Sequence, residues 1–389
     1  MADVVIVGSG LAGLSCARRL REWKVDCLVV EASDGVGGRV RTDRVDGFLL
    51  DRGFQVLLTA YPEAIALLDY NQLQLHSFEP GALVQRHGAR HLMADPWRRP
   101  GKALESLLAP IGTLGDKLRV ARMRYQVLYG GDRPETSTLA YLEEQGFSSS
   151  FINDFFRPFW SGIFLEPDLR TSSRVAEFVF RMMALGDTAL PRQGMGAISQ
   201  QLASDVPVRL NSTVVGLTGQ SITLESGERL QASAVVLATE GPAAARLMGL
   251  PEPGSRSVSC VYFAADVAPI SEGILVLNGD GCGPVNHLCV PSAVSSSYAP
   301  PGAALVSATV LGMNPDLAAV REQLAGWFGP VVHRWQHLRT YRIAHGQPEL
   351  TSLQFPPGLH VCGDYLESAS IQGALVSGRR AAEAVMKTL

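Results

Sequence analysis

Short, unbroken apolar runs bounded by glycine mark the beginning of the chain. Residues 3–7 (DVVIV) lead directly into the glycine-rich stretch 8–13 (GSGLAG), and a second apolar run at 25–30 (VDCLVV) ends at Glu31. Apolar runs of about four to eight residues between turn signals are typical of strands buried on both faces, as in parallel sheets. The pattern predicts a strand at 3–7, a helix that begins after Gly10, and a second strand at 25–30.

Later apolar runs predict further strands. The runs at 206–217 and 234–239, joined by a hairpin near Gly227, have strand character, as do those at 256–265 and 303–312. We expect the last two strands to form the floor and wall of a substrate cavity.

The segment 114–128 has a helical period, with apolar residues three or four positions apart and basic residues on the other faces. The apolar set is Leu114, Leu118, Ala121, Tyr125 and Leu128, and the basic set is Lys117, Arg119, Arg122 and Arg124. One interpretation is an amphipathic helix that makes peripheral contact with a membrane and admits a lipophilic substrate. The other, which we favour, is a substrate-domain helix with a solvated basic face.

Composition and length narrow the class of protein. With 389 residues, 46% of them hydrophobic, the chain is long enough for two domains with buried cores. A net charge of −3 gives no strong attraction to nucleic acid, and no apolar run of about 18 residues is present to span a bilayer. The six cysteines include no C-x-x-C pair, which is typical of reduced thiols in a cytosolic protein. Because the first strand begins at residue 3, we expect no targeting peptide and a cytoplasmic location.

The glycine spacing at 8–13 matches a dinucleotide-binding fingerprint. Gly8 can make the tight turn after the strand, Gly10 leaves room for a pyrophosphate, and Gly13 lets the helix pack against the strand. The helix then presents free N–H groups to the phosphates. Glu31 follows 21 residues after Gly10, where its carboxylate can accept hydrogen bonds from ribose hydroxyls and would repel a 2′-phosphate.

Two further motifs resemble the flavin-containing amine oxidase superfamily. Residues 37–42 (GGRVRT) match its G-G-R-x-x-T segment, and residues 363–364 (GD) and 373–382 (GALVSGRRAA) match its closing motifs. The resemblance implies FAD, with Arg39 at the diphosphate, Asp364 beside the ribityl and phosphate region, and the N-terminus of the last helix directed at the flavin pyrimidine. Because that helix contains no cysteine, we expect the FAD to be bound non-covalently.

The resemblance assigns cofactor contacts along the whole chain, with the backbone of Val214 at the adenine and residues 53–55 at the flavin. The predicted FAD contacts are Gly8, Gly10, Ala12, Gly13, Glu31, Ala32, Gly37, Gly38, Arg39, Gly53, Phe54, Gln55, Val214, Thr239, Gly363, Asp364, Ile371, Gln372, Gly373 and Ala374. Since they recur near both ends and in the middle, we expect an α/β fold with a discontinuous, Rossmann-type FAD-binding domain like that of glutathione reductase. This domain comprises residues 1–75, 190–250 and 345–389. Residues 76–189 and 251–344 form one inserted α+β substrate-binding domain.

Missing residues distinguish the branches of this superfamily. Its amine oxidases use a lysine near flavin N5 and an aromatic cage, but this chain has no lysine between residues 118 and 386, and Ser370 stands where the cage tyrosine is expected. Residues 156–164 and 338–344 instead resemble carotenoid desaturases and protoporphyrinogen oxidases. No second nucleotide fingerprint is present, so oxygen or a quinone is the expected electron acceptor.

The resemblance also supplies candidate site residues. Residues 51–55 (DRGFQ) resemble the segment that approaches flavin N5, so Arg52 and Gln55 are the catalytic candidates, unless Asp51 and Arg52 only tie a turn. The predicted substrate contacts are Arg157 and Arg342, for a polar substrate group, and Trp160 and Phe164, as pocket lining unless they are plain core. No catalytic base is identified, and no metal is expected, because no histidine pair has a third ligand nearby.

We therefore expect an FAD-dependent oxidoreductase that desaturates a hydrophobic small molecule by hydride transfer to flavin. Two alternatives stay open: a flavin amine oxidase with a divergent site, and an FAD-dependent isomerase of a polyene-type substrate. The sequence leaves the oligomeric state open.

Overall fold

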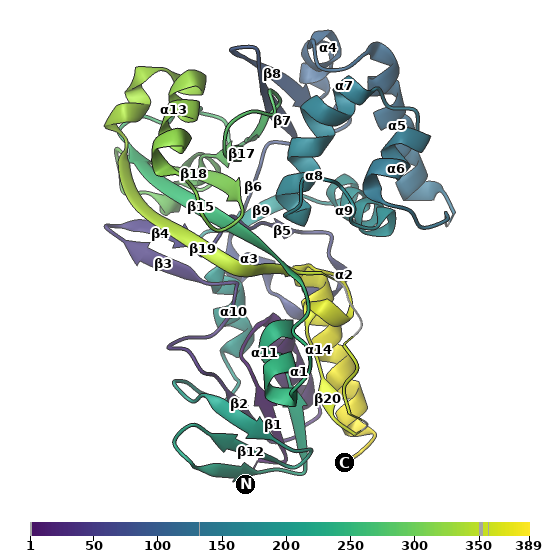
Figure 1. Ribbon diagram of the computed structural model, residues 1–389, viewed down its shortest axis with the longest axis vertical. Helices are drawn as coiled ribbons and strands as arrows, with labels where there is room; N and C mark the ends of the chain where they lie inside the picture. Colours follow the sequence, from purple (N-terminus) through teal and green to yellow (C-terminus); the bar gives the residue numbers. More distant parts are fainter. Residues whose placement is uncertain (1, 132, 350–352, 357) are drawn as a thin grey trace.

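A five-stranded parallel sheet forms the lower part of the molecule in Figure 1. The structure is a computed structural model that describes residues 2–131, 133–349, 353–356 and 358–389. The strand order is β10 (Val208–Arg209), β2 (Cys27–Val30), β1 (Val4–Val7), β14 (Ala234–Leu237) and β20 (His360–Val361), and all neighbouring pairs are parallel. Strands from the beginning, middle and end of the chain thus meet in one Rossmann-type sheet, as the recurrence of the motifs predicts.

Helices α1 (Leu11–Glu22) and α14 (Ile371–Met386) pack closely against each other beside this sheet. Gly378 permits the close approach, because a Cβ atom there would lie 2.1 Å from the Ala12 carbonyl oxygen. Helix α10 (Gly196–Ala203) also contacts α1, and α11 (Gly241–Met248) contacts β11 (Val214–Leu217).

The apolar run at 206–217 forms two strands in different sheets rather than one. β10 joins the parallel sheet, whereas β11 belongs to an antiparallel sheet with β12 (Ser221–Leu224) and β13 (Arg229–Gln231). The break falls at Asn211, whose φ of 51° lies in the left-handed region that asparagine tolerates better than most residues.

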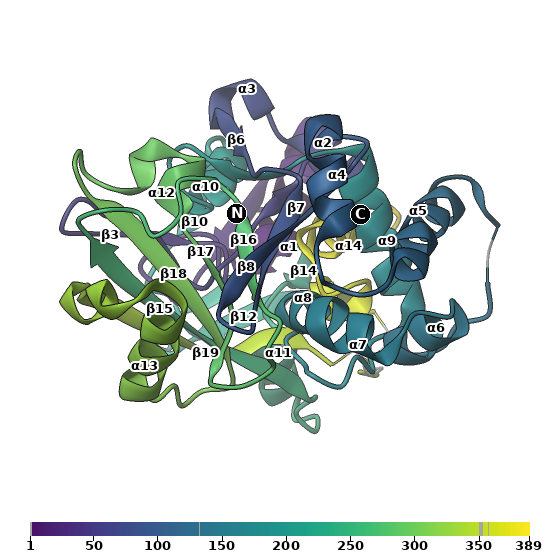
Figure 2. The same cartoon turned by 90° about the horizontal axis from the view of Figure 1, so that it is seen from above.

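The upper part of the molecule is built on a seven-stranded mixed sheet. Its order is β19 (Gln336–Pro348), β15 (Ser255–Ala265), β18 (Ala304–Leu311), β17 (Val285–Cys289), β16 (Leu275–Asn278), β7 (Gly81–Arg86) and β8 (Ala89–Ala94). Helix α13 (Leu317–Phe328) packs on one face, and the helices of residues 103–185 pack on the other (Figures 1 and 2). Both predicted inserted segments therefore contribute strands to one sheet.

The helical segment ahead of β9 (Thr188–Pro191) encloses an aromatic core. Its elements are a 3-10 turn (Pro100–Lys102), α4 (Ala103–Leu108), α5 (Leu114–Tyr129), α6 (Thr138–Glu144), α7 (Ser149–Phe151), a π-helical turn (Ile152–Phe156), α8 (Arg157–Phe164) and α9 (Ser173–Leu185). Helix α5 packs in an unexpected orientation: it buries Asp116 and Met123, whereas Leu114, Leu118 and Tyr125 are 58%, 64% and 66% exposed. The interpretation with a solvated basic face did not anticipate this outward-facing apolar row.

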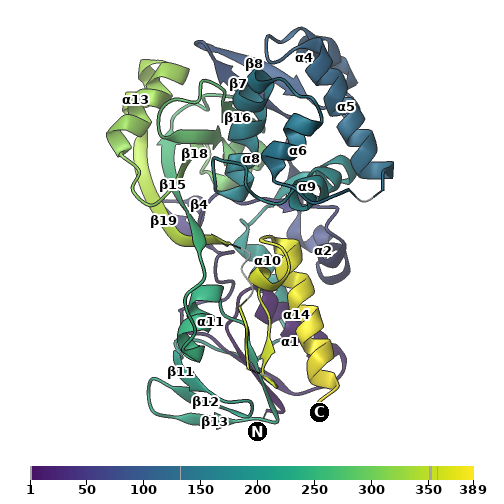
Figure 3. The same ribbon diagram turned by 45° about the vertical axis from the view of Figure 1, so that its right-hand side comes forward.

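Strands β15 and β19 run between the two parts of the molecule (Figure 1), and Figure 3 shows this junction with α8 and α9 above it and α10 and α14 below. The remaining elements are β3 (Thr42–Val45), β4 (Phe48–Asp51), β5 (Leu57–Leu58), β6 (Leu75–Ser77), α2 (Pro62–Leu67), α3 (Tyr70–Leu73), α12 (Pro291–Val294) and 3-10 turns at Ser296–Tyr298, Pro330–Arg334 and Asp364–Leu366. Among the described residues, no helix has the length and apolar character needed to cross a membrane.

Candidate active site

One cavity of about 2310 Å³ lies at the junction between the two parts. The first turn of the parallel sheet, the loop 52–56 and the start of α14 line one side, and α5, α8, α9 and the seven-stranded sheet line the other. Every residue predicted to contact FAD lines this cavity except Gly13. Because ligand pockets usually measure about 300–1,000 Å³, the cavity has room for a dinucleotide and a second molecule.

The fingerprint glycines have different surroundings. A Cβ atom at Gly13 would lie 2.1 Å from the Gly8 carbonyl oxygen, so only glycine lets α1 start this close to β1. A Cβ atom at Gly10 would meet no heavy atom within 4 Å, although Gly10 lines the cavity. The space beside Gly10 is thus open, as a pyrophosphate requires. The N-terminus of α1 also has no side-chain cap, which leaves its N–H groups for an anion.

Glu31 is oriented by serines at the end of β2. One carboxylate oxygen accepts hydrogen bonds from the N–H and hydroxyl of Ser9 at 2.8 and 2.7 Å, and the other from the N–H and hydroxyl of Ser33 at 2.9 and 2.7 Å. Burial raises the pKa of this carboxyl, but the hydrogen bonds from Ser33 and Ser9 outweigh burial and lower the pKa. Glu31 is therefore held ionised at the position predicted for the ribose.

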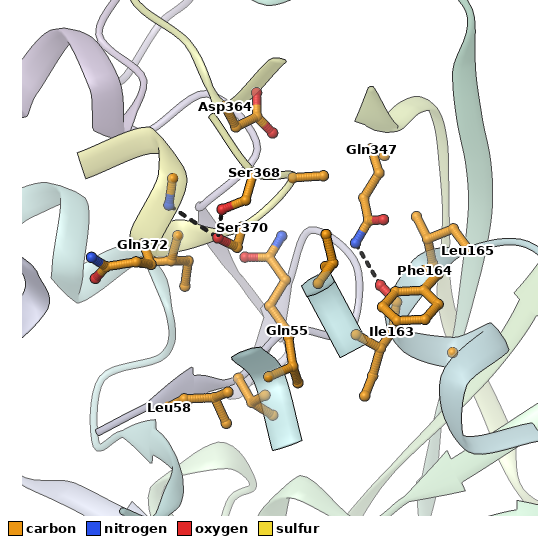
Figure 4. A pocket seen from close by; sticks show the side chains of 18 of the residues that line it. Gln55, Leu58, Ile163, Phe164, Leu165, Gln347, Asp364, Ser368, Ser370 and Gln372 are labelled. Carbon is orange, nitrogen blue, oxygen red and sulfur yellow. Dashed lines mark hydrogen bonds between the residues drawn. The ribbon is translucent and has the colours of Figure 1, made fainter. Parts of the chain in front are cut away.

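Arg39 and Asp364 connect distant parts of the chain at the cavity. Nη2 of Arg39 donates to Oδ1 of Asp364 at 2.7 Å, and Nη1 donates to the Gly346 carbonyl at 3.0 Å. The Gln55 Nε2 donates to the Arg39 carbonyl at 2.8 Å, whereas its Oε1 is buried with no hydrogen-bond partner among the described residues. Figure 4 shows the Gln55 side chain projecting between Ser370, at the start of α14, and the wall formed by Phe164.

The N-terminus of α14 opens onto the same cavity, which Ile371, Gln372, Gly373 and Ala374 line. The Ser370 hydroxyl caps this helix by accepting a hydrogen bond from the Gly373 N–H at 3.0 Å. The positive end of the helix dipole therefore faces the place predicted for the flavin pyrimidine.

The turn that contains Arg52 is tied on both sides. Nε and Nη2 of Arg52 donate to the Asp43 carboxylate at 3.2 and 3.0 Å, so the guanidinium is neutralised at the edge of the cavity. Asp51 lies behind the turn, where its carboxylate accepts hydrogen bonds from Thr42, from the Met195 N–H and from the Tyr298 hydroxyl. Burial raises the pKa of Asp51 to about 6 despite these bonds. The geometry favours the alternative that Asp51 and Arg52 tie the turn.

Phenylalanine dominates the cavity wall away from the parallel sheet, which suits an apolar ligand. The set is Phe54, Phe78, Phe151, Phe155, Phe156, Phe159, Phe164, Phe178 and Phe180. Phe164 lines the cavity as predicted.

The other three predicted substrate contacts do not line the cavity. Trp160 is 1% exposed and stacks on Phe164; the Phe164 ring lines the cavity, and Trp160 lies behind it in the core. Arg157 bonds to its own helical segment and to the following loop. Arg342 is exposed on β19, where the neighbouring Ile343 lines the cavity, since successive side chains of a strand point to opposite faces.

Residues that the sequence analysis missed also line the cavity. His287 on β17 and Thr309 on β18 lie on its floor, and Gln347 at the end of β19 donates to the Ile163 carbonyl across from Gln55 (Figure 4). A single histidine or threonine inside an apolar run carries no motif. Only the pairing of the strands brings these residues to the site.

The described parts of the chain contain no group of side chains suited to metal or thiol chemistry at the cavity. No three His, Cys, Asp or Glu side chains there are grouped so that they could hold a metal ion. All six cysteines are free thiols, Cys282 is the exposed one, and none lines the cavity.

The site fits FAD. The open space at Gly10 and the uncapped start of α1 suit a diphosphate, Glu31 suits a ribose, and the buried Thr239 hydroxyl has no hydrogen-bond partner among the described residues. A dinucleotide site at the carboxyl ends of a parallel sheet, joined to an apolar chamber, defines an FAD-dependent oxidoreductase.

The chain belongs to the flavin-containing amine oxidoreductase family, whose sequence model matches residues 11–386. Coproporphyrinogen III oxidase of Mycobacterium tuberculosis is 25% identical over 457 aligned positions that cover 99% of this chain and 97% of that protein. Some other matches are local: a possible lysine-specific histone demethylase of Drosophila melanogaster is 34% identical over 68 residues, which cover 18% of this chain and 8% of that protein.

Solved structures share the fold over almost the whole chain. An oxidoreductase from Methanosarcina mazei has a TM-score of 0.76 at 18% identity, and a putrescine oxidase variant has a TM-score of 0.72 at 17% identity. Each comparison covers 99% of both chains.

Proposed function

We propose that this FAD-dependent oxidoreductase desaturates a hydrophobic small molecule, with oxygen or a quinone as electron acceptor. The observation that supports this function is the continuity of the cavity. The same space contacts the predicted FAD residues, the phenylalanine wall, and Leu104 and Leu118 at the surface. A ligand that fills it buries mostly apolar area, which is the main driving force for binding.

When bound, FAD supplies the hydride acceptor. The phenylalanine wall would orient a C–H bond of the substrate and exclude water. Gln55, with its unpartnered Oε1, would hydrogen-bond the flavin or the substrate. Arg52 would act through its carbonyl, which accepts a hydrogen bond from Gln55 Nε2 at 3.4 Å.

Two alternatives have less support. An amine oxidase of this family would present a lysine to flavin N5, but the lysine among the cavity-lining residues is Lys117, whose Nζ donates to the carbonyls of Leu107 and Ala109 at 2.7 and 2.6 Å. Ser370, at the expected cage position, caps α14. An isomerase would use the same cavity without net oxidation, so reaction stoichiometry separates it from a desaturase.

Anaerobic titration of the purified holoenzyme tests the proposed function. Coproporphyrinogen III, a polyene precursor and putrescine are each added while the absorption band of oxidised flavin is followed. We expect stoichiometric bleaching by coproporphyrinogen III or by the polyene precursor, the two donors with a large apolar framework, and none by putrescine. Bleaching by putrescine, with peroxide release in air, would establish the amine oxidase alternative, and conversion of the polyene without bleaching would establish the isomerase.

We further propose that the face around α4 and α5 contacts a membrane surface. Eight large apolar side chains there are 45–74% exposed: Trp97, Leu104, Leu107, Leu108, Leu114, Leu118, Tyr125 and Tyr129. Residues 97–129 carry seven Lys or Arg and two Asp or Glu, although the whole chain carries 34 and 37. Several of these cations pair with carboxylates, as Arg98 does with Asp187 and Arg124 with Asp95. The exposed apolar side chains therefore make the main contribution, and the remaining positive charge suits a surface of anionic lipids.

Cosedimentation with vesicles tests this contact. Wild-type protein should bind vesicles that contain anionic lipid, less so at high salt, and the double variant Leu104→Ser/Leu118→Ser should bind at least about tenfold more weakly. Met386→Ser, at the far end of α14, is the matched exposed control and should bind like wild type. Equal binding by all three proteins, or none by wild type, contradicts the proposed contact.

A further inference from the structure

The floor of the cavity contains a pair of neighbouring polar side chains. His287 on β17 and Thr309 on β18 are register partners on neighbouring strands, and both line the cavity. Leu277 on β16 is the partner of His287 on its other side. The ring of Phe54, from the loop predicted to meet the flavin, lies edge-on to the His287 ring at 5.3 Å between centroids. The polar pair is therefore adjacent to the predicted flavin face.

Both members of the pair have a buried polar atom with no hydrogen-bond partner among the described residues. These atoms are Nε2 of His287 and the hydroxyl oxygen of Thr309, and the two residues are 3% and 2% exposed. Leaving a buried polar group unpaired costs about 1–3 kcal/mol, so such groups at a cavity wall point to a ligand.

The neighbours of His287 determine its proton position. The amide nitrogen of Asn286 donates to the Pro158 carbonyl at 2.8 Å and lies 3.0 Å from Nδ1 of His287. An amide nitrogen only donates, so Nδ1 accepts and Nε2 carries the proton. Burial lowers the pKa of His287 to about 4, which keeps the ring neutral near pH 7. Gly162 leaves room for the ring, because a Cβ atom there would lie 2.6 Å from Nδ1.

We propose that His287 and Thr309 bind a hydroxyl or carbonyl oxygen of the substrate, which makes the substrate an oxygenated apolar molecule rather than a pure hydrocarbon. The Nε2–H donates, and the threonine hydroxyl both donates and accepts, so together they match an oxygen atom. The Gln55 Oε1, also unpartnered, can accept from a substrate hydroxyl. This inference rests on the proposed function only where it calls the bound molecule a substrate, because its binding is measurable without turnover.

Two matched probes, 2-naphthol and naphthalene, test the pair through the change each causes in the flavin absorption spectrum of the holoenzyme. Wild-type protein should bind 2-naphthol about tenfold more tightly than naphthalene. Thr309→Val and His287→Phe should each remove most of this preference. Ser259→Ala is the control: its buried hydroxyl donates to the Gly312 carbonyl at 2.8 Å on the opposite face of the same sheet, so the preference should persist.

Thermal unfolding separates a ligand-binding role from a structural one. If the Thr309 hydroxyl has no protein partner, Thr309→Val should keep or raise the Tm, whereas Ser259→Ala should lower it. A clear fall in Tm for Thr309→Val overturns the inference, as does equal binding of the two probes by wild type, no binding of either, or a preference that survives both substitutions. If wild-type protein prefers 2-naphthol but oxidises none of the tested donors, only the proposed redox function is wrong.

Discussion

The substitution Gly10→Ala separates cofactor binding from folding. Gly10 has φ −66° and ψ 174°, a conformation that alanine adopts without strain, and the added methyl group would meet no protein atom within 4 Å. Replacing glycine at such a position stabilises a protein by about 0.4–1 kcal/mol through the unfolded chain. The apoprotein should therefore unfold at the wild-type temperature or slightly above it.

The same methyl group would occupy the space predicted for the pyrophosphate. Inserting a methyl group into a filled site costs about 1–3 kcal/mol, which corresponds to about a fivefold to hundredfold loss of FAD affinity. Fluorescence quenching during FAD titration of the apoprotein measures the affinity, and differential scanning fluorimetry measures the Tm.

Gly13→Ala is the contrasting variant. Its Cβ atom would lie 2.1 Å from the Gly8 carbonyl oxygen, so we expect loss of folded protein rather than selective loss of FAD. The reasoning is refuted if Gly10→Ala binds FAD like wild type, or if its apoprotein loses several degrees of Tm.

Three further changes test the charges around the site. Wild-type protein should lose about 3 kcal/mol of stability as the pH rises from about 4 to 6, because the pKa of Asp51 is raised from 3.8 to about 6 and the folded state holds the proton more tightly. Asp51→Asn should not show this loss, and urea unfolding across this pH range measures it. The pH effect of His287 has the opposite sign: because its pKa is lowered from 6.5 to about 4, wild-type protein should lose about 3 kcal/mol of stability as the pH falls through that interval. His287→Phe should not show this loss, so its acid unfolding should start at lower pH than that of wild type. Arg39→Ala leaves Asp364 without its ion-pair partner and should weaken FAD binding at least tenfold in equilibrium dialysis.

Each of these outcomes has a clear contradiction. Wild type and Asp51→Asn with the same pH slope would show that Asp51 is not protonated near pH 5. A steeper acid transition for His287→Phe would contradict a neutral His287. Unchanged FAD affinity in Arg39→Ala would place the diphosphate elsewhere.

The cofactor side of the site was largely predictable because its signals are local. A glycine at a tight turn, a glycine under a close helix, and an acid at the end of the next strand each act through the backbone within a few residues. The parallel sheet places these segments together wherever they occur in the chain. Glu31, Arg39 and Asp364 accordingly line one cavity.

The substrate side was less predictable because its contacts depend on which face of an element turns inward. Trp160 lies in the core and Arg342 faces outward, although both belong to segments that resemble known relatives. Helix α5 turns leucines outward and buries Asp116, since the capping hydrogen bonds of that carboxylate satisfy it inside. Periodicity shows that a helix has two faces, but not which one the rest of the chain covers.

The sequence by itself determined the cofactor, the family and the parallel sheet, because phosphate-binding turns and buried strands are encoded in short stretches with fixed spacing. Only the tertiary structure decided what the cavity offers a substrate. His287 and Thr309 lie 22 residues apart in the chain and become neighbours through strand pairing. No local pattern specifies that pairing, so the chemistry of the cavity floor appears only once the sheet has formed.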